Sequence, residues 1–541
     1  MVRRLLVLLS VLSLAFPMAA NAQDPAVESF ERAPIQGAVD PQVLPAGIDD
    51  SRLVNVMVQL DGDPVAVRQA QSRAKLTKAE KDAIKAELKA RQDAIKDDIA
   101  ARGGTVLSQL QSAYNGMRVQ IARADAASLA SLPNVVAVRA LQVQTIENAV
   151  AVPYIGGPQV WENLGFHGEG IKVAVIDTGI DYTHANFGGA GTVKAFQQAD
   201  RGDTRADRSG FFGPNAPKVK GGFDFVGDAY DASSDDPKLT VPHPDPNPLD
   251  CNGHGSHVAG SAAGFGVNAN GTTYTGSYDE TTHNNAFRIG PGVAPKAELY
   301  ALRVFGCEGS TDVTVEAIDW AVDHDMDVIN MSLGSPFGRS DDPSAEASTN
   351  AAGAGVIVVA SAGNEGEAGM GFPGAYAPVI SVAASGWTGE WTTPTSNWWR
   401  TLDVADPTAA RDFYITDFSS REKAGQDLDV AAPGSWVVGP FQNQSGNLSY
   451  FFLGGTSMAS PHVAGIAALM MQKDATLRQA QVETILESTA IALPAGCRKV
   501  IDPNVGPTEF CWGADATGAG LATADRALAA VGGATVSAKR K

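Results

Sequence analysis

The chain has 541 residues, which is enough for a large core and more than one domain. Its hydrophobic content of 44% and charged content of 19% are those of a soluble globular protein. The formal net charge is -19, and the acidic excess lies beyond residue 147. Such a surface repels nucleic acid and anionic membranes, so we expect neither as a partner.

Residues 1–22 have the pattern of a secretory signal peptide. Two arginines precede an apolar run over 5–16, and Ala20-Asn21-Ala22 forms a small-x-small cleavage site. The alternative is a membrane anchor, but the apolar run is shorter than the roughly 20 residues that span a bilayer. We therefore expect removal of the signal, secretion, and no membrane association afterwards.

A small α+β domain is predicted after a Pro-, Gly- and Asp-rich linker, with its folded part at about 50–141. The expected elements are strands at 53–60, 105–110, 116–121 and 135–138, a long amphipathic helix at 77–101 and a short helix at 123–132. The order β-α-β-β-α-β is that of a ferredoxin-like domain. Residues 23–147 contain nothing with catalytic spacing.

The rest of the chain, 148–541, is predicted to be a doubly wound α/β domain with a mainly parallel sheet. Short Val- and Ile-rich runs alternate with helical stretches, as expected for strands buried on both faces. These runs are at 172–176, 298–303, 328–331, 356–360 and 379–383. We interpret 186–250 and 386–416 as surface insertions, and 521–531 as a terminal helix.

The chain contains four cysteines, a number that suits disulfide bonds in an oxidising compartment. Three pairings are open. Proximity in the sequence favours Cys497 with Cys511, which leaves Cys251 with Cys307. A zinc site is the alternative, but the usual C-x-x-C spacing is absent.

Four segments carry residues of a nucleophilic site. Asp177 ends an apolar strand, His254 lies between two glycines at a helix start, and Asn364 follows another strand. Ser457 opens a helix of small residues after Gly454-Gly455. Taken alone, each has a simpler explanation: a turn aspartate, a structural histidine, a turn asparagine and a helix cap.

Together, the four residues supply every role that acyl transfer requires. A serine hydroxyl needs a histidine to accept its proton, and a carboxylate to orient that histidine. Charge on the attacked carbonyl oxygen needs fixed donors, which the Ser457 N–H and the Asn364 amide would provide. Ligands of open α/β sheets bind at the carboxyl ends of strands, where these segments are predicted to lie.

The chain resembles the subtilisin-like serine endopeptidases, or subtilases, over roughly 150–535. The matching motifs include Val175-Ile176-Asp177-Thr178-Gly179, Gly253-His254-Gly255, Ala362-Gly363-Asn364 and Gly455-Thr456-Ser457-Met458-Ala459. The resemblance implies a triad of Asp177, His254 and Ser457, with Asn364 as the oxyanion residue. It also implies a substrate cleft lined by Ser332, Leu333, Gly334, Ser361, Ala362 and Gly363, and a cis proline at Phe372-Pro373.

The resemblance further implies that the small domain is an inhibitory propeptide. Its C-terminal segment would lie in the cleft as a substrate does, and maturation would cut the chain between about 142 and 152. The alternative is a stable accessory domain. We thus expect a secreted, monomeric endopeptidase that acts on proteins and peptides and processes its own precursor.

Subtilases commonly bind structural calcium, although the chemistry itself requires no cofactor. In this chain the acidic stretch with Asp224, Asp228, Asp231, Asp235 and Asp236 offers oxygen ligands. It lacks a defined loop motif, so a solvated acidic loop is the favoured interpretation and no metal ligands are assigned.

Two other functions remain as alternatives. The first is a non-catalytic peptide-binding protein on a subtilase scaffold, but a lost triad residue would be its signature and none is missing. The second is an extracellular esterase, which would carry a G-x-S-x-G elbow instead of Gly-Thr-Ser-Met-Ala.

Overall fold

We describe the protein from a computed structural model. The structure describes residues 53–532 with these gaps: 73, 141–144, 147–151, 153–154, 280–281, 283–284, 337–341, 377, 389–411, 442–449 and 503–505. All described residues belong to one compact unit, Arg32–Lys541. The predicted signal peptide, the linker and most of the predicted maturation segment lie outside the described residues.

The N-terminal domain contains a four-stranded antiparallel sheet in the order β2-β3-β1-β4. Its strands are β1 (Leu53–Leu60), β2 (Thr105–Leu110), β3 (Gly116–Ala122) and β4 (Val135–Ala140). Its helices are α1 (Val65–Gln71), α2 (Lys78–Asp93), α3 (Lys96–Ala101) and α4 (Arg123–Ala126). Because apolar side chains alternate along β1 and β3, one set of them forms a separate core with Ile95, Ile99 and Leu129.

The long helix predicted at 77–101 is two helices, since α2 ends at Asp93 and α3 begins at Lys96. Thr77 caps α2, and its capping box with Glu80 satisfies backbone N–H groups at the start of the helix. The break falls at Ile95, whose non-helical backbone starts α3 and whose side chain is buried in the core.

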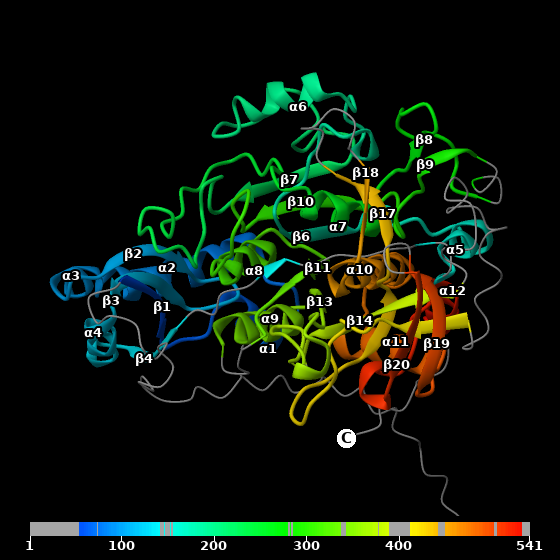
Figure 1. Cartoon of the computed structure of the whole chain (residues 1–541). Helices are drawn as coiled ribbons and strands as arrows, with labels where there is room; N and C mark the ends of the chain where they lie inside the picture. The colour runs from blue at the N-terminus through cyan, green and yellow to red at the C-terminus, as the bar shows by residue number, and fades with distance from the viewer. Residues whose placement is uncertain are drawn as a thin grey trace, which may run out of the picture. The chain divides into compact units, whose positions relative to one another are not determined.

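The second domain is built on an eight-stranded sheet with the path β15-β14-β13-β11-β6-β10-β7, and β16 pairs with β14 (Figure 1). All pairings are parallel except that of β15 with β14. The strands are β6 (Lys172–Asp177), β7 (Val219–Asp224), β10 (Glu298–Arg303), β11 (Val328–Met331), β13 (Ile357–Ser361), β14 (Ile380–Trp387), β15 (Phe413–Ile415) and β16 (Val430–Pro433).

Helices cover both faces of this sheet, which confirms the doubly wound α/β prediction. On β6, Val173 and Val175 face one apolar cluster, while Ala174 and Ile176 face another. The first cluster includes α7 (His254–Ala263) and α10 (Thr456–Lys473), and the second includes α8 (Thr314–Asp323) and α9 (Pro343–Gly353). The strands are apolar on both sides because each side is buried.

The prediction that 186–250 is a surface insertion is wrong in one part, because β7 from this range is an edge strand of the main sheet. A Cβ on Gly222 would lie 2.0 Å from the Ala301 carbonyl oxygen, so the close strand pairing needs glycine there. The pair Gly221-Gly222 is typical of a loop, so the sequence did not indicate a strand at this place. The ends of the other predicted insertion also enter the sheet as β14 and β15, and 389–411 lie outside the described residues.

Smaller elements complete the domain. They are α5 (Gly157–Leu164), α6 (Val193–Asp200), α11 (Gln479–Thr489), α12 (Ala524–Ala530), and the pairs β8 (Val267–Asn268) with β9 (Phe287–Ile289), β17 (Val437–Pro440) with β18 (Tyr450–Leu453), and β19 (Gly496–Asp502) with β20 (Gly506–Trp512). The terminal helix predicted from Leu521 begins at Ala524, because Leu521 pairs with Ile491.

Both favoured disulfides are confirmed, Cys251–Cys307 and Cys497–Cys511. The Phe372-Pro373 bond is cis, as expected. Among the described residues, no helix combines the length and apolar character required to cross a bilayer.

Candidate functional site

Two of the predicted residues meet at the carboxyl end of β6. Asp177 is the last residue of that strand, and His254 is the first residue of α7. The Nδ1 atom of His254 lies 2.6 Å from Oδ1 of Asp177, and both side chains are buried. A carboxylate at this distance accepts a hydrogen bond from Nδ1–H, which leaves Nε2 as the basic nitrogen.

The approach of α7 to β6 depends on glycine. Gly253 caps the helix with a φ of 108°, and a Cβ on Gly255 would lie 2.1 Å from the Gly179 carbonyl oxygen. These glycines therefore allow the close approach of α7 that positions His254 beside Asp177.

Sequence reasoning missed a buried carboxylate that holds this geometry. Asp250 accepts hydrogen bonds from the N–H groups of Asn252 and Gly253, and from Ser256. It also accepts from the Thr178 hydroxyl, which in turn accepts from Gly255 N–H. Burial raises the pKa of Asp250, and these donors act in the opposite direction. The only signal in the sequence is an aspartate three residues before a glycine at a helix start.

Ser457 lies in the first turn of α10 and is fully buried in the full chain. Its Oγ donates to the Ser332 carbonyl oxygen at 3.0 Å. The Ser332 hydroxyl donates back to the Ser457 carbonyl oxygen and lies 2.9 Å from the Ser460 Oγ. The serine is thus placed beside the segment that follows β11, at the carboxyl end of the sheet.

Asn364 is joined to the residue before Ser457. Its Oδ1 accepts from the Thr456 N–H at 2.9 Å and from the Thr456 hydroxyl at 3.0 Å. Gly363 N–H donates to the same hydroxyl at 3.1 Å, so Thr456 links the two segments. Because Oδ1 is engaged, the Nδ2 group is the end of the amide suited to donate to a developing oxyanion.

The predicted substrate-binding segments lie side by side. Ser361 ends β13, and its hydroxyl donates to the Leu333 carbonyl oxygen at 3.4 Å. The Ala362 N–H donates to the Val382 carbonyl oxygen, and the Gly371 N–H donates to the Ala362 carbonyl oxygen. The short strand β12 (Leu333–Gly334) pairs antiparallel with β5 (Thr145–Ile146), a segment from the end of the predicted propeptide.

The structure thus brings Asp177 to His254 and Asn364 to Thr456 by direct hydrogen bonds. Ser332 joins Ser457 in the same way, and Leu333 and Gly334 bind an extended strand. The Ser457 hydroxyl donates its hydrogen bond to the Ser332 carbonyl oxygen.

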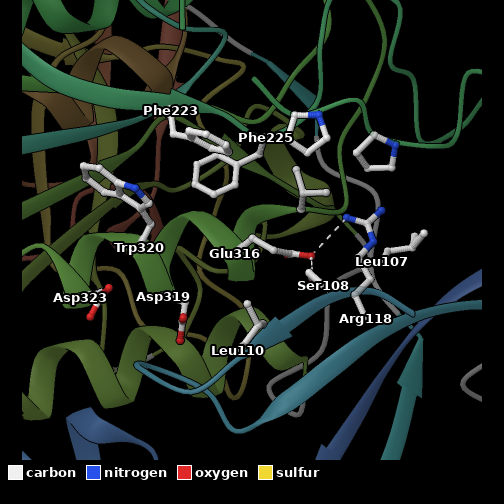
Figure 2. Close-up of a pocket in the computed structure, with 13 residues that line it drawn as sticks. Leu107, Ser108, Leu110, Arg118, Phe223, Phe225, Glu316, Asp319, Trp320 and Asp323 are labelled. Atoms are coloured by element: carbon white, nitrogen blue, oxygen red, sulfur yellow. Dashed lines mark hydrogen bonds and ion pairs between the residues drawn. The ribbon is translucent and has the colours of Figure 1, made fainter. Parts of the chain in front are cut away.

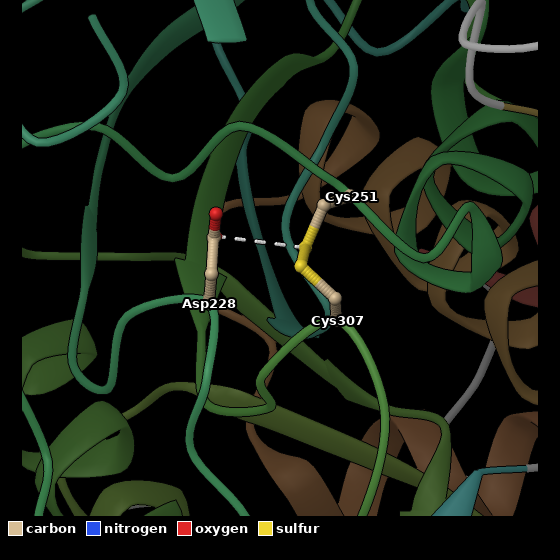
Figure 3. A group of neighbouring side chains, drawn as sticks. All are labelled: Asp228, Cys251 and Cys307. Atoms are coloured by element: carbon tan, nitrogen blue, oxygen red, sulfur yellow. Dashed lines mark hydrogen bonds between the residues drawn. A yellow bond between two sulfur atoms is a disulfide. The ribbon is translucent and has the colours of Figure 1, made fainter. Parts of the chain in front are cut away.

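Three aspartates of the acidic stretch have hydrogen-bond or ion-pair partners within the chain. Asp224 and Asp228 form ion pairs with the buried Arg303 at 3.0 and 2.8 Å, and Asp231 binds Ser233 and Ser310. Asp228 also lies beside Cys251 and Cys307 (Figure 3). Both sulfurs belong to a disulfide, so they cannot serve as thiolate ligands.

A second set of contacts joins the N-terminal domain to α8 and its neighbours. Oδ1 of Asp319 accepts from the N–H groups of Ser112, Ala113 and Tyr114 at 2.8, 2.6 and 3.3 Å. Buried Arg118 pairs with Asp312, and Gln59 donates to Glu346 at 2.8 Å. Burial raises the pKa of Asp319 to about 7, while the three N–H donors oppose that rise.

A cavity of about 430 Å³ lies beside these contacts (Figure 2). Leu107, Ser108 and Arg118 of the N-terminal domain line one side, and Phe223, Phe225 and Trp320 line the other. None of the predicted catalytic residues lines it, so it belongs to the contact between the domains.

A doubly wound sheet with a buried Asp–His pair and a helix-borne serine at its carboxyl edge defines a serine hydrolase. Residues 168–526 match the peptidase S8 family, described as the subtilase family. Subtilisin E of Bacillus subtilis (strain 168) is 32% identical over 357 residues, which cover 64% of this chain and 68% of that protein. Subtilisin DY of Bacillus licheniformis is 33% identical over 349 residues, covering 63% and 91%.

The chain belongs to the subtilase family and is a serine-type endopeptidase. A solved structure with the same fold is fervidolysin from Fervidobacterium pennivorans, a keratinolytic enzyme related to subtilisin. It has a TM-score of 0.56 and 21% identity over 93% of this chain, and the match spans 64% of the fervidolysin chain.

Proposed function

We propose that this protein is a secreted serine endopeptidase that hydrolyses peptide bonds through an acyl-enzyme and is made as a self-processing precursor. Ser457 attacks the peptide carbonyl, His254 transfers the proton, Asp177 orients His254, and Asn364 stabilises the oxyanion. The 2.6 Å contact between His254 and Asp177 is the observation that carries the proposal. It supports the tautomer of His254 that carries its proton on Nδ1, in which Nε2 is the basic nitrogen.

In the precursor the Ser457 hydroxyl donates to Ser332. A rotation about its Cα–Cβ bond would release this bond and turn the hydroxyl toward a base. Such a rotation moves between staggered rotamers and requires no backbone change. Attack would then place the negative charge at the start of α10, where the Ser457 N–H and the helix dipole favour it.

We also propose that residues 23–147 act as an inhibitory propeptide on the domain formed by 148–541. The antiparallel pairing of β5 with β12 supports this, because a peptide substrate would add to Leu333–Gly334 by the same backbone bonds. The contacts of Asp319, Arg118 and Gln59 would hold the domain in place. After removal of residues 1–22, the proposed product acts on protein substrates outside the cell.

A fluorophosphonate probe tests the proposed chemistry, because it labels only an activated serine. Mass spectrometry of the labelled, secreted product should place the label on Ser457 and show a mature N-terminus between about 142 and 152. A correctly processed product without label would contradict the acyl-enzyme. It would favour the alternative, a non-catalytic peptide-binding protein.

Asn364→Ala is expected to lower kcat by about 10²-fold or more and to leave KM nearly unchanged. The amide would donate to an oxyanion that exists only after attack, so its loss affects the transition state and not substrate binding. Steady-state hydrolysis of a chromogenic peptide measures both constants. An unchanged kcat would remove Asn364 from the mechanism.

Asp319→Ala is expected to loosen the N-terminal domain, because three backbone N–H groups lose their side-chain acceptor. In the full chain with Ser457→Ala, hydrogen exchange at residues 112–114 should become at least about tenfold faster. The matched comparison is Asp323→Ala, which removes a single ion pair between α8 and Lys85 of α2 and is expected to have a smaller effect. Equal exchange in both variants would show that Asp319 does not hold the domain.

A further inference from the structure

The cavity between the N-terminal domain and the second domain has the size and lining of a small-molecule site. Its volume is about 430 Å³, and its lining is mainly apolar (Figure 2). The larger apolar residues in the lining are Leu107, Leu110, Phe223, Phe225, Val313 and Trp320. Phe223 and Phe225 meet edge to face, with ring centroids 5.1 Å apart. Cavities of this volume with aromatic walls and a few polar groups typically bind small organic molecules.

Glu316 of α8 brings a carboxylate into this lining, and its side chain is only 8% exposed. Oε1 accepts a hydrogen bond from the Ser108 hydroxyl at 2.9 Å. Oε2 is buried and has no hydrogen-bond partner among the described residues. A buried carboxylate oxygen has lost its water, so it is rarely left without a donor. Oε2 therefore calls for a donor that the described part of the chain does not supply.

Arg118 of β3 has the opposite need at the same place. Its Nη2 group donates to Asp312 and to the Tyr230 hydroxyl. Its Nε and Nη1 groups are buried, and within the described ranges neither has a hydrogen-bond acceptor. Nη1 lies 3.6 Å from Glu316 Oε1, which is close enough for an ion pair but too long for a hydrogen bond (Figure 2). The cavity thus offers a ligand an unfilled acceptor beside unfilled donors.

The charges around the cavity disfavour ligands of a single charge. Glu316, Asp319 and Asp323 line it together, so an organic anion would be repelled. The guanidinium of Arg118 would repel a metal ion, and an organic cation would leave Nε and Nη1 without an acceptor. Burial raises the pKa of Glu316, and the charge of Arg118 opposes that rise. An ammonium group beside Glu316 would act in the same direction as Arg118.

We propose that the full chain binds a free aromatic α-amino acid in this cavity. The ammonium group of the ligand donates to Glu316 Oε2, and its carboxylate accepts from Nε and Nη1 of Arg118. Its ring contacts Phe223, Phe225 and Trp320, where edge-to-face contacts of aromatic rings are favourable. One carbon atom separates the two charged groups of an α-amino acid, which suits two side chains whose ion pair is 3.6 Å long.

Such a ligand would join the two domains. Ser108 and Arg118 come from the N-terminal domain, whereas Glu316 and the aromatic residues come from the second domain. The site is complete only while the domains are in contact, so bound ligand favours that contact by mass action. The site belongs to the uncleaved chain, and it therefore stands independently of the proposed hydrolysis.

Isothermal titration with three probes of similar size tests the site in the full chain with Ser457→Ala. L-Phenylalanine should bind with a Kd below about 1 mM. 2-Phenylethylamine lacks the carboxylate and 3-phenylpropionate lacks the ammonium group, so each should bind at least about tenfold more weakly. Equal affinity for the three probes would overturn the proposal, because only the apolar lining would then be recognised. Absence of saturable phenylalanine binding, as expected of a cavity that holds only water, would also overturn it.

Glu316→Gln tests the role of the carboxylate at nearly constant side-chain volume. The Kd for phenylalanine should rise at least about tenfold, because the ammonium group loses its charged acceptor. The Kd for 3-phenylpropionate should stay the same or fall, since this probe has no ammonium group and a negative charge has been removed. The matched control is Glu162→Gln, which changes an exposed glutamate of α5 and should keep the parent Kd. A phenylalanine Kd that is equal in Glu316→Gln and the parent would contradict the assignment.

Hydrogen exchange gives a readout that needs no variant of the site. Asp319 lines the cavity and accepts from the N–H groups of residues 112–114. Phenylalanine at ten times its Kd should slow exchange at these residues by about tenfold, because opening the domain contact would release the ligand. Unchanged exchange with phenylalanine bound would place the ligand elsewhere and overturn the proposal.

Discussion

Ser457→Ala is expected to abolish peptide-bond hydrolysis, with kcat reduced about 10⁶-fold, the size of this effect in subtilisin itself. Alanine leaves no atom to form the acyl-enzyme, and the rest of the site can then act only on a water molecule. The precursor should also accumulate uncleaved, because the same serine would process the chain. Hydrolysis of a chromogenic peptide and the mass of the secreted product measure the two effects.

Ser488→Ala is the matched control, since this serine is exposed on α11 and its hydroxyl donates to the Ile485 carbonyl oxygen of the same helix. It should keep full activity. A Ser457→Ala protein that still processes itself would rule out Ser457 as the nucleophile. A circular dichroism spectrum equal to that of the parent excludes misfolding as the cause.

Asp177→Asn is expected to lower kcat at neutral pH by about 10⁴-fold with little change in fold. The amide nitrogen can donate to Nδ1 of His254, which would place the ring proton on Nε2. That nitrogen could then no longer accept the proton of Ser457. The near-isosteric change retains the volume beside His254, so the loss should appear in kcat rather than in KM.

Asp235→Asn makes the same chemical change at an exposed aspartate and should leave kcat unaltered. The rate of fluorophosphonate labelling provides an independent readout, because it depends on the same proton transfer. A Asp177→Asn protein within tenfold of the parent in both assays would show that the 2.6 Å contact does not control the tautomer.

The catalytic candidates could be found in the sequence because each belongs to a short motif at the end of a strand or at the start of a helix. Asp177 ends β6, and Ala362 to Asn364 follow β13. The supporting residues could not be found in this way. Asp250 has its supporting role because its loop folds back and brings it to the Thr178 hydroxyl. Thr456 has such a role because the distant segment with Asn364 meets the start of α10.

The fold was predictable where patterning was strong. Buried strands such as Glu298–Arg303 and Val328–Met331 agree with the predicted ranges, because burial on both faces favours a mostly apolar run. β7 was misread because Gly222 is required by its close approach to Ala301, and glycine in a sequence usually marks a turn.

Local chemistry was enough to identify the family, the doubly wound sheet and the residues capable of acyl transfer, since a motif and its spacing act over a few residues. Short motifs could not predict the contacts between distant segments. The pairing of β5 with β12, the anchoring of Ser112–Tyr114 by Asp319 and the meeting of Arg118 with Glu316 exist only in the folded chain. They depend on which surfaces meet, and no short stretch of sequence contains that information.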